Sequence, residues 1–320
     1  MYHISTQRYE YAAIYSQLAA QCVAPYFSPE WLDAVCGKEG WRCICIVADN
    51  RQVLLFPYYC PVPSAITQPP FTQFLGPLIA TTSEAKVSFS DQRNLVEALL
   101  EHFPLVSSCS LHTSPQLTDW LPFHWRGFRQ TTRYTYILEL HQNEDQSSLP
   151  GKFNQLLRRK LRTAERMGLS FEEECCFSDL KVMVEHSLGR SHTHLLYADR
   201  LEQLYQTMHE RQRGSIYKST LNGHTVASVF MVRNAHCSYY IAGGQDESQC
   251  KDALAHCLYN AICTEIEKYG SRSIDFEGSM IRGVEFFFRS FGAIQTPYFA
   301  LSRGKMSILS RICRKLLTRP

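Results

Sequence analysis

The stretch that decides the fold begins with residues 214–244, which read GSIYKSTLNGHTVASVFMVRNAHCSYYIAGG. Its first eight residues alternate side chains as a strand does, and Asn222-Gly223 is a strong hairpin signal before the β-branched run HTVASVFMVR. A second turn at Asn234-Ala235 leads into CSYYIAGG. The sequence therefore predicts three consecutive antiparallel strands in this stretch.

A helix, a strand and a second helix follow. Apolar residues recur at helical spacing between residues 251 and 268, and Gly270 ends that run. Residues 271–278, SRSIDFEG, are typical of a short buried strand, and residues 284–291 predict an aromatic-rich helix closed by Gly292. Few folds share this order, in which three antiparallel strands feed a crossover helix and then a parallel strand.

Length and composition favour an ordered protein of two domains. The chain has 320 residues, more than one typical domain of about 100–200 residues. Hydrophobic residues make up 45% of the chain and aromatic residues 12%, which indicates globular cores. No apolar run approaches the roughly 18 residues of a membrane span, and the first residues lack the basic and apolar regions of a secretory signal. We therefore expect a cytoplasmic protein.

Charge, cysteine content and histidine spacing argue against DNA binding, disulfide bonds and a metal site. The net charge of +3 is too mild for a general nucleic-acid binder, so DNA binding is not expected. The 13 cysteines are odd in number and favour reduced thiols over disulfides in a long chain without an export signal. His192 and His194 have no third ligand at a suitable spacing, so no metal site is expected.

The segment before the three strands predicts further helices. Residues 152–167 form an apolar helical stripe with a basic outer surface, in which Glu165 is the only acid. A strand candidate at residues 169–175 precedes helices predicted over residues 178–188 and 199–211.

The first half of the chain repeats this order faintly. A helix over residues 29–35 precedes two strands that are joined by a turn at Asp49-Asn50, and residues 71–80, FTQFLGPLIA, stand where CSYYIAGG stands later. A helix over residues 91–102 and a strand over residues 105–112 then follow. We infer two copies of one domain, with coincidence between two mixed α/β halves as the alternative.

The join between the halves is expected at residues 141–151, HQNEDQSSLPG, a polar segment that ends in Pro-Gly. We predict an N-terminal domain over residues 1–145 and a C-terminal domain over residues 146–303. A basic amphipathic helix is predicted over residues 304–320. Each domain is expected to be an α/β unit, with a mixed and mostly antiparallel sheet flanked by helices.

This element order, together with SRSIDFEGSMIRGVEFFFRSFGA at residues 271–293, resembles the GNAT superfamily of N-acyltransferases. More narrowly, it is similar to the tandem-domain branch that includes Fem-type peptidoglycan aminoacyl transferases and acetyltransferase-like relatives. The resemblance implies two tandem GNAT-like domains, of which the first is degenerate. It also implies that the strands at residues 237–243 and 271–276 splay apart, leaving a V-shaped cleft for the acyl donor.

The resemblance places donor binding at the end of the third strand, on Ala242, Gly243, Gly244 and Gln245. Backbone amides there are candidates for stabilising the oxyanion of the reaction. The chain lacks the Gly-rich turn with which acetyl-coenzyme A users bind pyrophosphate, and it has Asp246 and Glu247 where phosphates would dock. Fem-type relatives, whose donor is aminoacyl-tRNA, also lack an intact turn. No tightly bound cofactor is expected, and acyl-CoA is the expected co-substrate.

Acyl transfer from an activated donor requires two oriented reactants and the removal of one proton. A strand that leaves the sheet at Asp-Phe-Glu-Gly would place Asp275 and Glu277 on one side, so either is a candidate base. Alternatively, these carboxylates cap the next helix or pair with Arg282 or Arg272. Tyr259 is a candidate proton donor, with burial in the core as its alternative.

Further candidates concern substrate and surface. Tyr240 is a candidate for substrate binding, and so are Arg282 and Arg289, because guanidinium groups match phosphate in two-point geometry. A buried tyrosine and two solvated arginines are the alternatives. The basic helix at residues 152–166 and the tail at residues 304–320 could meet an RNA acceptor stem or anionic lipid. Ordinary charged helix faces are the other interpretation.

We therefore expect an N-acyltransferase that moves an acyl group, most readily from acyl-CoA, to an amine on a small molecule or a peptidoglycan precursor. One alternative is a Fem-type transferase that uses aminoacyl-tRNA and acts on a cell-wall precursor, with tRNA as a partner. Another is a non-catalytic ligand-binding module of the same fold. Peripheral membrane contact through the tail is a further expected property.

Overall fold

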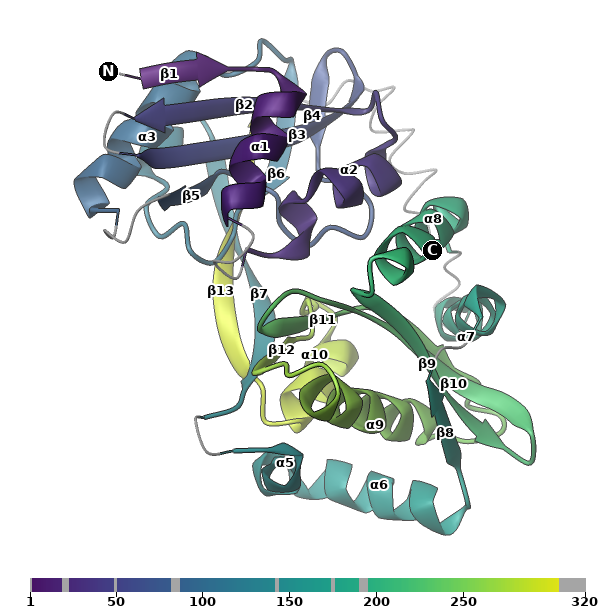
Figure 1. The fold of residues 1–320 in the computed structure, drawn as a ribbon. Coiled ribbons are helices and arrows are strands. Elements are labelled where there is room, and N and C mark those ends of the chain that lie inside the picture. Colours follow the sequence, from purple (N-terminus) through teal and green to yellow (C-terminus); the bar gives the residue numbers. More distant parts are fainter. Residues whose placement is uncertain are drawn as a thin grey trace. The chain divides into compact units, whose positions relative to one another are not determined.

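The computed structural model describes residues 2–18, 23–48, 51–81, 87–141, 144–173, 176–189 and 195–304 (Figure 1). These residues form two compact units. The first unit comprises the chain up to Arg133 together with residues 297–304, and the second comprises Tyr134–Thr296. His192, His194 and, apart from Gly304, the predicted tail helix lie outside the described residues.

The first unit is built on a mixed sheet with helices around it. Its strands are β1 (Tyr2–Ser5), β2 (Trp41–Ala48), β3 (Gln52–Val62), β4 (Ala65–Thr67), β5 (Leu78–Thr81), β6 (Ser108–His112) and the second part of β13 (Ile294–Gly304). Its helices are α1 (Arg8–Leu18), η2 (Pro25–Phe27), α2 (Pro29–Cys36), α3 (Phe89–Glu101) and α4 (Leu121–Trp125). The strand order is β1-β2-β3-β4-β6-β13, with β4 and β6 parallel and β5 paired to β3.

The second unit has the same plan. Its strands are the second part of β7 (Arg129–Glu139), β8 (Ser170–Glu173), β9 (Gly214–Leu221), β10 (His224–Arg233), β11 (Cys237–Gln245), β12 (Ser273–Asp275) and the first part of β13. Its helices are η3 (Gln146–Ser148), α5 (Leu149–Lys152), α6 (Gln155–Arg166), α7 (Phe177–Gly189), α8 (Ala198–Glu210), α9 (Ala253–Glu267) and α10 (Arg282–Ser290). The strand order is β7-β12-β11-β10-β9-β8, with β11 and β12 parallel.

The predicted meander, crossover helix and parallel strand are confirmed in the second unit. Asn222 and Gly223 both have positive φ angles, 51° and 80°, which is the backbone that a two-residue hairpin turn requires. The chain then runs through β10 and β11, crosses in α9 and returns parallel to β11 in β12. The predicted fold class, a mixed α/β sheet flanked by helices, is therefore confirmed.

The first unit contains a matching run, β2-β3-β4, followed by α3 and the parallel strand β6. One detail of the predicted repeat is wrong. β4, at Ala65–Thr67, takes the place expected for residues 71–80, and β5 (Leu78–Thr81) covers only the last three residues of that stretch. Pro69 and Pro70 cannot donate to a sheet, and Phe71 has a φ of 53°, so the chain leaves the extended conformation there.

Each unit is closed by a strand from the other half of the sequence. β7 follows α4 in the chain, yet it pairs antiparallel with β12, where Leu138 faces Ile274. β13 follows α10, yet it pairs antiparallel with β6, where Leu301 faces Leu111. A separately folding domain over residues 1–145 remains a prediction.

The helices of the second unit cover both faces of its sheet (Figure 1). α6 and α9 lie on one face, and α7 and α8 on the other. The single helix predicted over residues 152–167 is interrupted at Phe153, and Asn154 caps α6 by accepting a 2.8 Å hydrogen bond from the Leu157 amide. Among the described helices, none combines the length and apolar character needed to cross a bilayer.

A buried ion pair fastens α9 to the meander. Glu265, whose side chain is 0% exposed, accepts 2.7 Å hydrogen bonds from both Nε and Nη2 of Arg233 in β10. Tyr217 of β9 and Ser238 of β11 each donate to the same carboxylate at 2.7 Å. Every strand of the meander therefore contributes a donor to one helix residue, and the charge is neutralised inside the core.

We expect Glu265→Ala to lower the free energy of unfolding by about 3–5 kcal/mol, because Arg233 would keep its buried charge without a partner. Urea denaturation monitored by circular dichroism measures the change. The matched control is Arg289→Ala, which removes the exposed pair with Glu285 and should cost no more than about 1 kcal/mol. Equal losses in the two variants would contradict this role for Glu265.

Candidate functional site

β11 and β12 fork after a short paired segment. Residues 237–239 of β11 pair in parallel with residues 273–275 of β12. β12 ends there, whereas β11 continues to Gln245 with β10 as its partner. The other edge of β12 pairs with β7 along its whole length. The pairing of the two strands therefore ends at Tyr239 and Asp275, which we call the apex of the fork, and the cleft that the resemblance implied remains a prediction.

A β-bulge bends β11 just beyond this apex. The register between β10 and β11 shifts at Phe230, which leaves Ile241 as an extra residue. The extra residue interrupts the alternation of side chains, so Tyr240 and Gly243 share a face although they are three residues apart. A Cβ on Gly243 would lie 2.5 Å from the Tyr240 hydroxyl. Glycine at this position therefore makes room for the phenol.

Aromatic side chains line the face of the fork that carries Tyr240. The Tyr240 ring packs on Phe288 of α10 at 5.6 Å, and Phe288 stacks on Phe276 at 5.2 Å. Burial raises the pKa of Tyr240, and the negative charge of Glu277 raises it further. The rings of Tyr240, Phe288 and Phe276 thus form a continuous aromatic contact beside the fork.

Gly244 lies on the face of β11 opposite to Tyr240 and Gly243, where α7 packs. A Cβ on Gly244 would lie 2.0 Å from the backbone oxygen of Met183, so only glycine permits this approach. The next amide, that of Gln245, donates to the Ser187 hydroxyl at 3.0 Å. The glycine pair predicted for donor binding therefore also has a packing role on each face.

Asp275 is a buried carboxyl at the apex and is 4% exposed. Its Oδ1 accepts hydrogen bonds from the Thr135 hydroxyl of β7 and, at 2.8 Å, from the Glu277 amide. Among the described residues, no donor reaches Oδ2. Burial raises the pKa of Asp275 to about 6, although both hydrogen bonds oppose that rise. A carboxyl with such a pKa can accept a proton near neutral pH.

Glu277 does not continue the strand. Its φ is 57°, and Gly278 follows with a φ of 64° at a point where a Cβ would lie 2.1 Å from the Tyr134 oxygen. The expected strand alternation between Asp275 and Glu277 is therefore absent, because β12 ends at Asp275 and the chain turns tightly against β7. The roles of the two carboxylates remain predictions.

The turn before α9 is closed by its own side chains. The side-chain oxygen Oε1 of Gln245 accepts a 2.7 Å hydrogen bond from the Leu254 amide in the first turn of α9, and Nε2 of Gln245 donates to the Lys251 backbone oxygen at 3.2 Å. Asp246 accepts the Ser248 amide at 3.0 Å. An amide that could point at a phosphate is therefore already bonded, and a carboxylate lies within the same turn.

Tyr259 has its described contacts elsewhere in the second unit. Its ring meets Phe153 edge to face at 5.7 Å, and burial, followed by the neighbouring Cys263, raises the pKa of Tyr259 to about 12. The carboxylates that influence it are Glu165 and Glu267. These contacts do not bring Tyr259 together with Asp275.

Arg282 and Arg289 both lie on the exposed surface of α10. Arg289 is 56% exposed, forms a 2.7 Å ion pair with Glu285 and lies over the Phe286 ring at 5.4 Å. Arg282 is the first residue of the helix. Substrate binding by either arginine remains a prediction.

The matching position in the first unit has a different set of ionisable groups. A pocket there is lined by residues of β3, β4 and β6, including Tyr58, Thr67 and Leu111. Its described lining contains neither carboxylates nor imidazoles nor amines. Proton transfer therefore fits the second unit better than the first.

Two polar partners of this unit left no signal in the sequence. Thr135 lies 140 residues before the carboxyl to which it donates, and only the exchange of β7 brings the two together. His256 of α9 lies 2.8 Å from the Ser219 hydroxyl, and burial lowers the pKa of this histidine. Both residues of the Ser219–His256 pair are buried, so we interpret it as a satisfied polar contact of the core.

The raised pKa of Asp275 predicts a stability that depends on pH. The folded state binds a proton more tightly than the unfolded state between about pH 4 and 6, so Asp275 lowers stability as the pH rises through that window. We expect Asp275→Asn to raise the free energy of unfolding at pH 7.5 by about 2–3 kcal/mol, and to have little effect at pH 4.

Urea denaturation at the two pH values measures this difference. The matched control is Asp246→Asn, which should lower stability at pH 7.5, because hydrogen bonds from Ser248 and Gln249 hold the pKa of Asp246 below its ordinary value. An Asp275→Asn variant that is less stable than the wild type at pH 7.5 would show that its charge is not costly in the fold.

Gly244→Ala should lower the free energy of unfolding by about 1–3 kcal/mol, because the new methyl group meets the α7 backbone. The control is Gly283→Ala in α10. A Cβ there would have no described heavy atom of another residue within 4 Å outside its own helix backbone and chain neighbours, so little change in stability is expected. Thermal and urea unfolding check both variants. A fully stable Gly244→Ala protein would remove the packing role.

Comparison with known proteins adds to this geometry. Residues 151–289 match the family model described as the acetyltransferase (GNAT) domain. No curated protein matches the sequence of the chain. The matched segment includes the meander, α9, β12 and most of α10, and thus the fork.

Several solved structures share the fold of the chain. The structure of FemX has a TM-score of 0.66 at 13% identity, covering 93% of this chain and 96% of that one. The C-terminal domain of a protein described as a lysylphosphatidylglycerol synthetase from Agrobacterium fabrum has a TM-score of 0.57 at 12% identity, covering 92% of each chain. A tandem GNAT protein from the clavulanic acid biosynthesis pathway has a TM-score of 0.52 at 7% identity, covering 96% of this chain and 100% of that one.

At these identities the solved structures establish the fold alone, and the family model matches residues 151–289. Because FemX and the tandem GNAT protein are matched over nearly their whole length, the likeness extends over both units. The chain therefore has the fold of tandem GNAT proteins, and its residues 151–289 match the model of the GNAT acetyltransferase domain.

Proposed function

We propose that this chain is an N-acyltransferase that works at the fork of the second unit and takes its acyl group from an aminoacyl ester of RNA. The observation that carries acyl transfer is the fork itself, with the buried carboxyl of Asp275 at its apex. Such a site meets the two needs of the reaction, since strand ends orient the reactants and a carboxyl of raised pKa accepts the proton.

In the proposed reaction, the amine nitrogen of the acceptor attacks the carbonyl carbon of the donor ester. A nitrogen–carbon bond forms, and the Asp275 carboxylate takes the proton from nitrogen. The carbon–oxygen bond of the ester then breaks, and the ribose hydroxyl leaves with that proton. Thr135 and the Glu277 amide hold Oδ1, so Oδ2 is the oxygen that would exchange the proton.

The choice of donor rests on the turn before α9. A coenzyme A pyrophosphate placed there would have to compete with Gln245 for the Leu254 amide, and it would face the Asp246 carboxylate. An aminoacyl ester needs no pyrophosphate site. Fem-type relatives use such donors, and the name of the lysylphosphatidylglycerol synthetase describes an aminoacylated product.

Acyl-CoA is the second candidate donor. The observation in its favour is the description of the matched family as an acetyltransferase domain. For the acceptor, we propose an amine on a small molecule or a peptidoglycan precursor, since the reaction at the fork forms an amide. A non-catalytic module of the same fold is the remaining alternative.

The test compares donors with one set of amine acceptors. We expect transfer from aminoacyl-tRNA, and none above background from acetyl-coenzyme A, in assays that follow a radiolabelled acyl group. Asp275→Asn should lower kcat on the order of 10²-fold with little change in KM, because it removes the base but keeps the hydrogen-bond geometry. For the wild type, kcat should fall as the pH drops below about 6, and the variant should lose this dependence.

The matched control is Arg126→Gln, an exposed change in the first unit that should leave kcat unchanged. Transfer from acetyl-coenzyme A alone would establish the second donor instead. Transfer from neither donor would favour the non-catalytic module. Full activity of Asp275→Asn would remove this carboxyl from the mechanism.

A further inference from the structure

The outer surface of α6 carries a group of exposed arginines, which we call the arginine face. Its members are Arg158, Arg159, Arg162 and Arg166. At about 100° per residue they fall within an arc of roughly 100°, opposite the buried stripe of the helix. That stripe consists of Leu157, Leu161 and Ala164. One side of α6 therefore belongs to the core, and the other presents positive charge.

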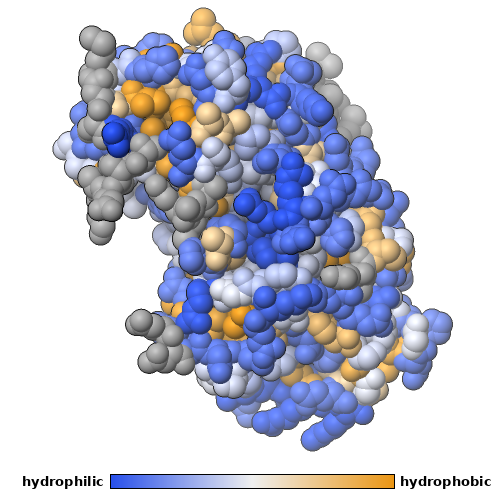
Figure 2. All heavy atoms as spheres, in the orientation of Figure 1, coloured by the Kyte–Doolittle hydropathy of each residue, from blue (hydrophilic) through white to orange (hydrophobic). Residues whose placement is uncertain are grey.

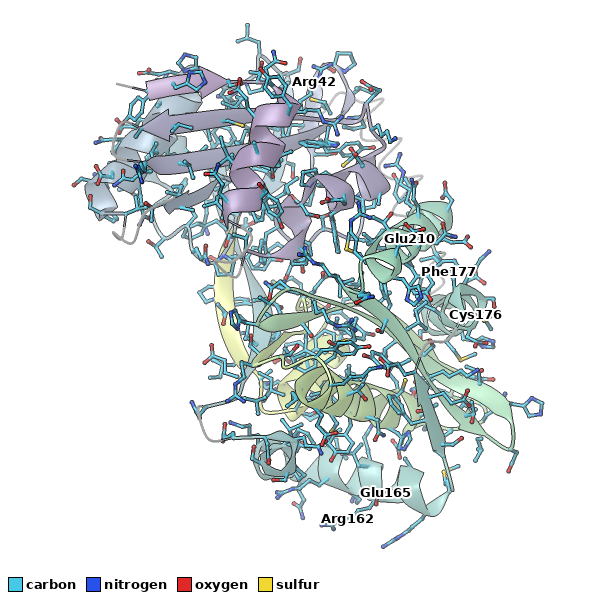
Figure 3. The ribbon with its side chains drawn as sticks, in the orientation of Figure 1. Arg42, Arg162, Glu165, Cys176, Phe177 and Glu210 are labelled. Atoms are coloured by element: carbon cyan, nitrogen blue, oxygen red, sulfur yellow. The ribbon has the colours of Figure 1, made fainter. Side chains whose placement is uncertain are left out.

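The pictures agree with this arrangement. Figure 3 shows the Arg162 side chain extending from α6 on the side away from α9. In Figure 2, hydrophilic residues predominate along the lower edge of the second unit, where α6 lies in Figure 1. The arginine face is thus turned to solvent.

The charges of the arginine face are not neutralised by ion pairs within the described part of the chain. Among the described residues, no carboxylate forms an ion pair with any of its members. Nearby cations differ in this respect, since Lys152 pairs with Glu144 at 2.8 Å and Lys160 pairs with Asp252 at 3.4 Å. The fold thus neutralises Lys152 and Lys160 and leaves the arginines of α6 available.

From this contrast we infer that the arginine face binds the phosphate backbone of the RNA that carries the acyl group. The inference rests on the proposed function, because it concerns the body of the proposed donor. Arg158, Arg162 and Arg166 follow one another at about 6 Å along the helix axis, which suits contact with successive phosphates. Guanidinium groups bind phosphate oxygens in a fork geometry, and such contacts position RNA without reading its sequence.

A membrane surface fits the same helix less well. A helix that lies in a bilayer interface buries its apolar side among the lipids, whereas the apolar stripe of α6 is already buried in the protein. The arginine face has charged and polar neighbours, including Thr163 and Glu165. A polyanion that stays in water therefore matches it better than a bilayer.

The position of α6 relative to the fork supports this assignment. The ion pair between Lys160 and Asp252 places α6 beside the start of α9. That start is joined by Gln245 to the end of β11, the longer strand of the fork. An RNA bound along α6 would thus lie on the side of the unit where β11 ends.

The experiment titrates fluorescent deacylated tRNA and a 12-base-pair RNA hairpin with the full chain at increasing KCl concentration. The test variant changes all members of the arginine face to Gln. We expect its affinity for either RNA at 50 mM KCl to fall on the order of 10²-fold, and the slope of log Kd against log salt to decrease by about 3–4. Circular dichroism checks that α6 remains folded.

A matched control removes the same charge elsewhere on the surface. Its changes are Arg126→Gln, Arg129→Gln, Lys181→Gln and Arg213→Gln, all at exposed positions. This control should lose less than threefold in affinity. Equal losses in the two variants, or no loss in the test variant, would overturn the assignment. Vesicles containing phosphatidylglycerol address the membrane: if the test variant loses vesicle binding and keeps RNA binding, the assignment is wrong.

A second donor separates this inference from the proposed function. An aminoacyl-adenosine ester carries the reacting bond without an RNA body. The test variant should use it as fast as the wild type and lose turnover with aminoacyl-tRNA. If the wild type uses neither ester, the proposed function fails, and the RNA titration alone decides whether the arginine face binds phosphate. Equal loss with both esters would show that these arginines act on more than the RNA body.

Discussion

The charge of Glu265 imposes the main constraint on the second unit. A carboxylate that is 0% exposed is tolerated only when donors satisfy it, and here they come from β9, β10 and β11 together. The three strands and α9 are thus tied to one point. Ser238, one of the donors, belongs to the segment of β11 that pairs with β12, so the same contact anchors the base of the fork.

Beyond that anchored base, the two strands of the fork have different partners. β11 pairs with β10 on both sides of the bulge at Ile241, whereas β12 pairs with β7. Gly243 leaves space for the Tyr240 phenol on one face of β11, and Gly244 leaves space for the α7 backbone on the other face. Packing alone therefore explains both glycines, and the buried carboxyl of Asp275 remains as a titratable group at the apex.

Local signals predicted most of the second unit, since the Asn222-Gly223 turn and the helical spacing in α9 act over a few residues. They failed at residues 71–80, where prolines just before an apolar run break the strand. They also could not supply Thr135, which reaches Asp275 only through the exchange of β7. The sequence located Asp275 and Glu277, but it did not predict the directions of their side chains. Glu277 has a left-handed backbone conformation, which ends the side-chain alternation of the strand.

The exchange of β7 and β13 between the two halves also affects how the chain folds during its synthesis. β6 ends at His112 and its partner β13 begins at Ile294, so roughly 180 residues separate them. At about 5–20 residues per second, a ribosome needs roughly 10–40 s to span that interval. During synthesis the first half therefore exposes an unpaired sheet edge, which is open to association with other chains until the last strand emerges. Translation speed and chaperone access would thus influence the yield of this protein.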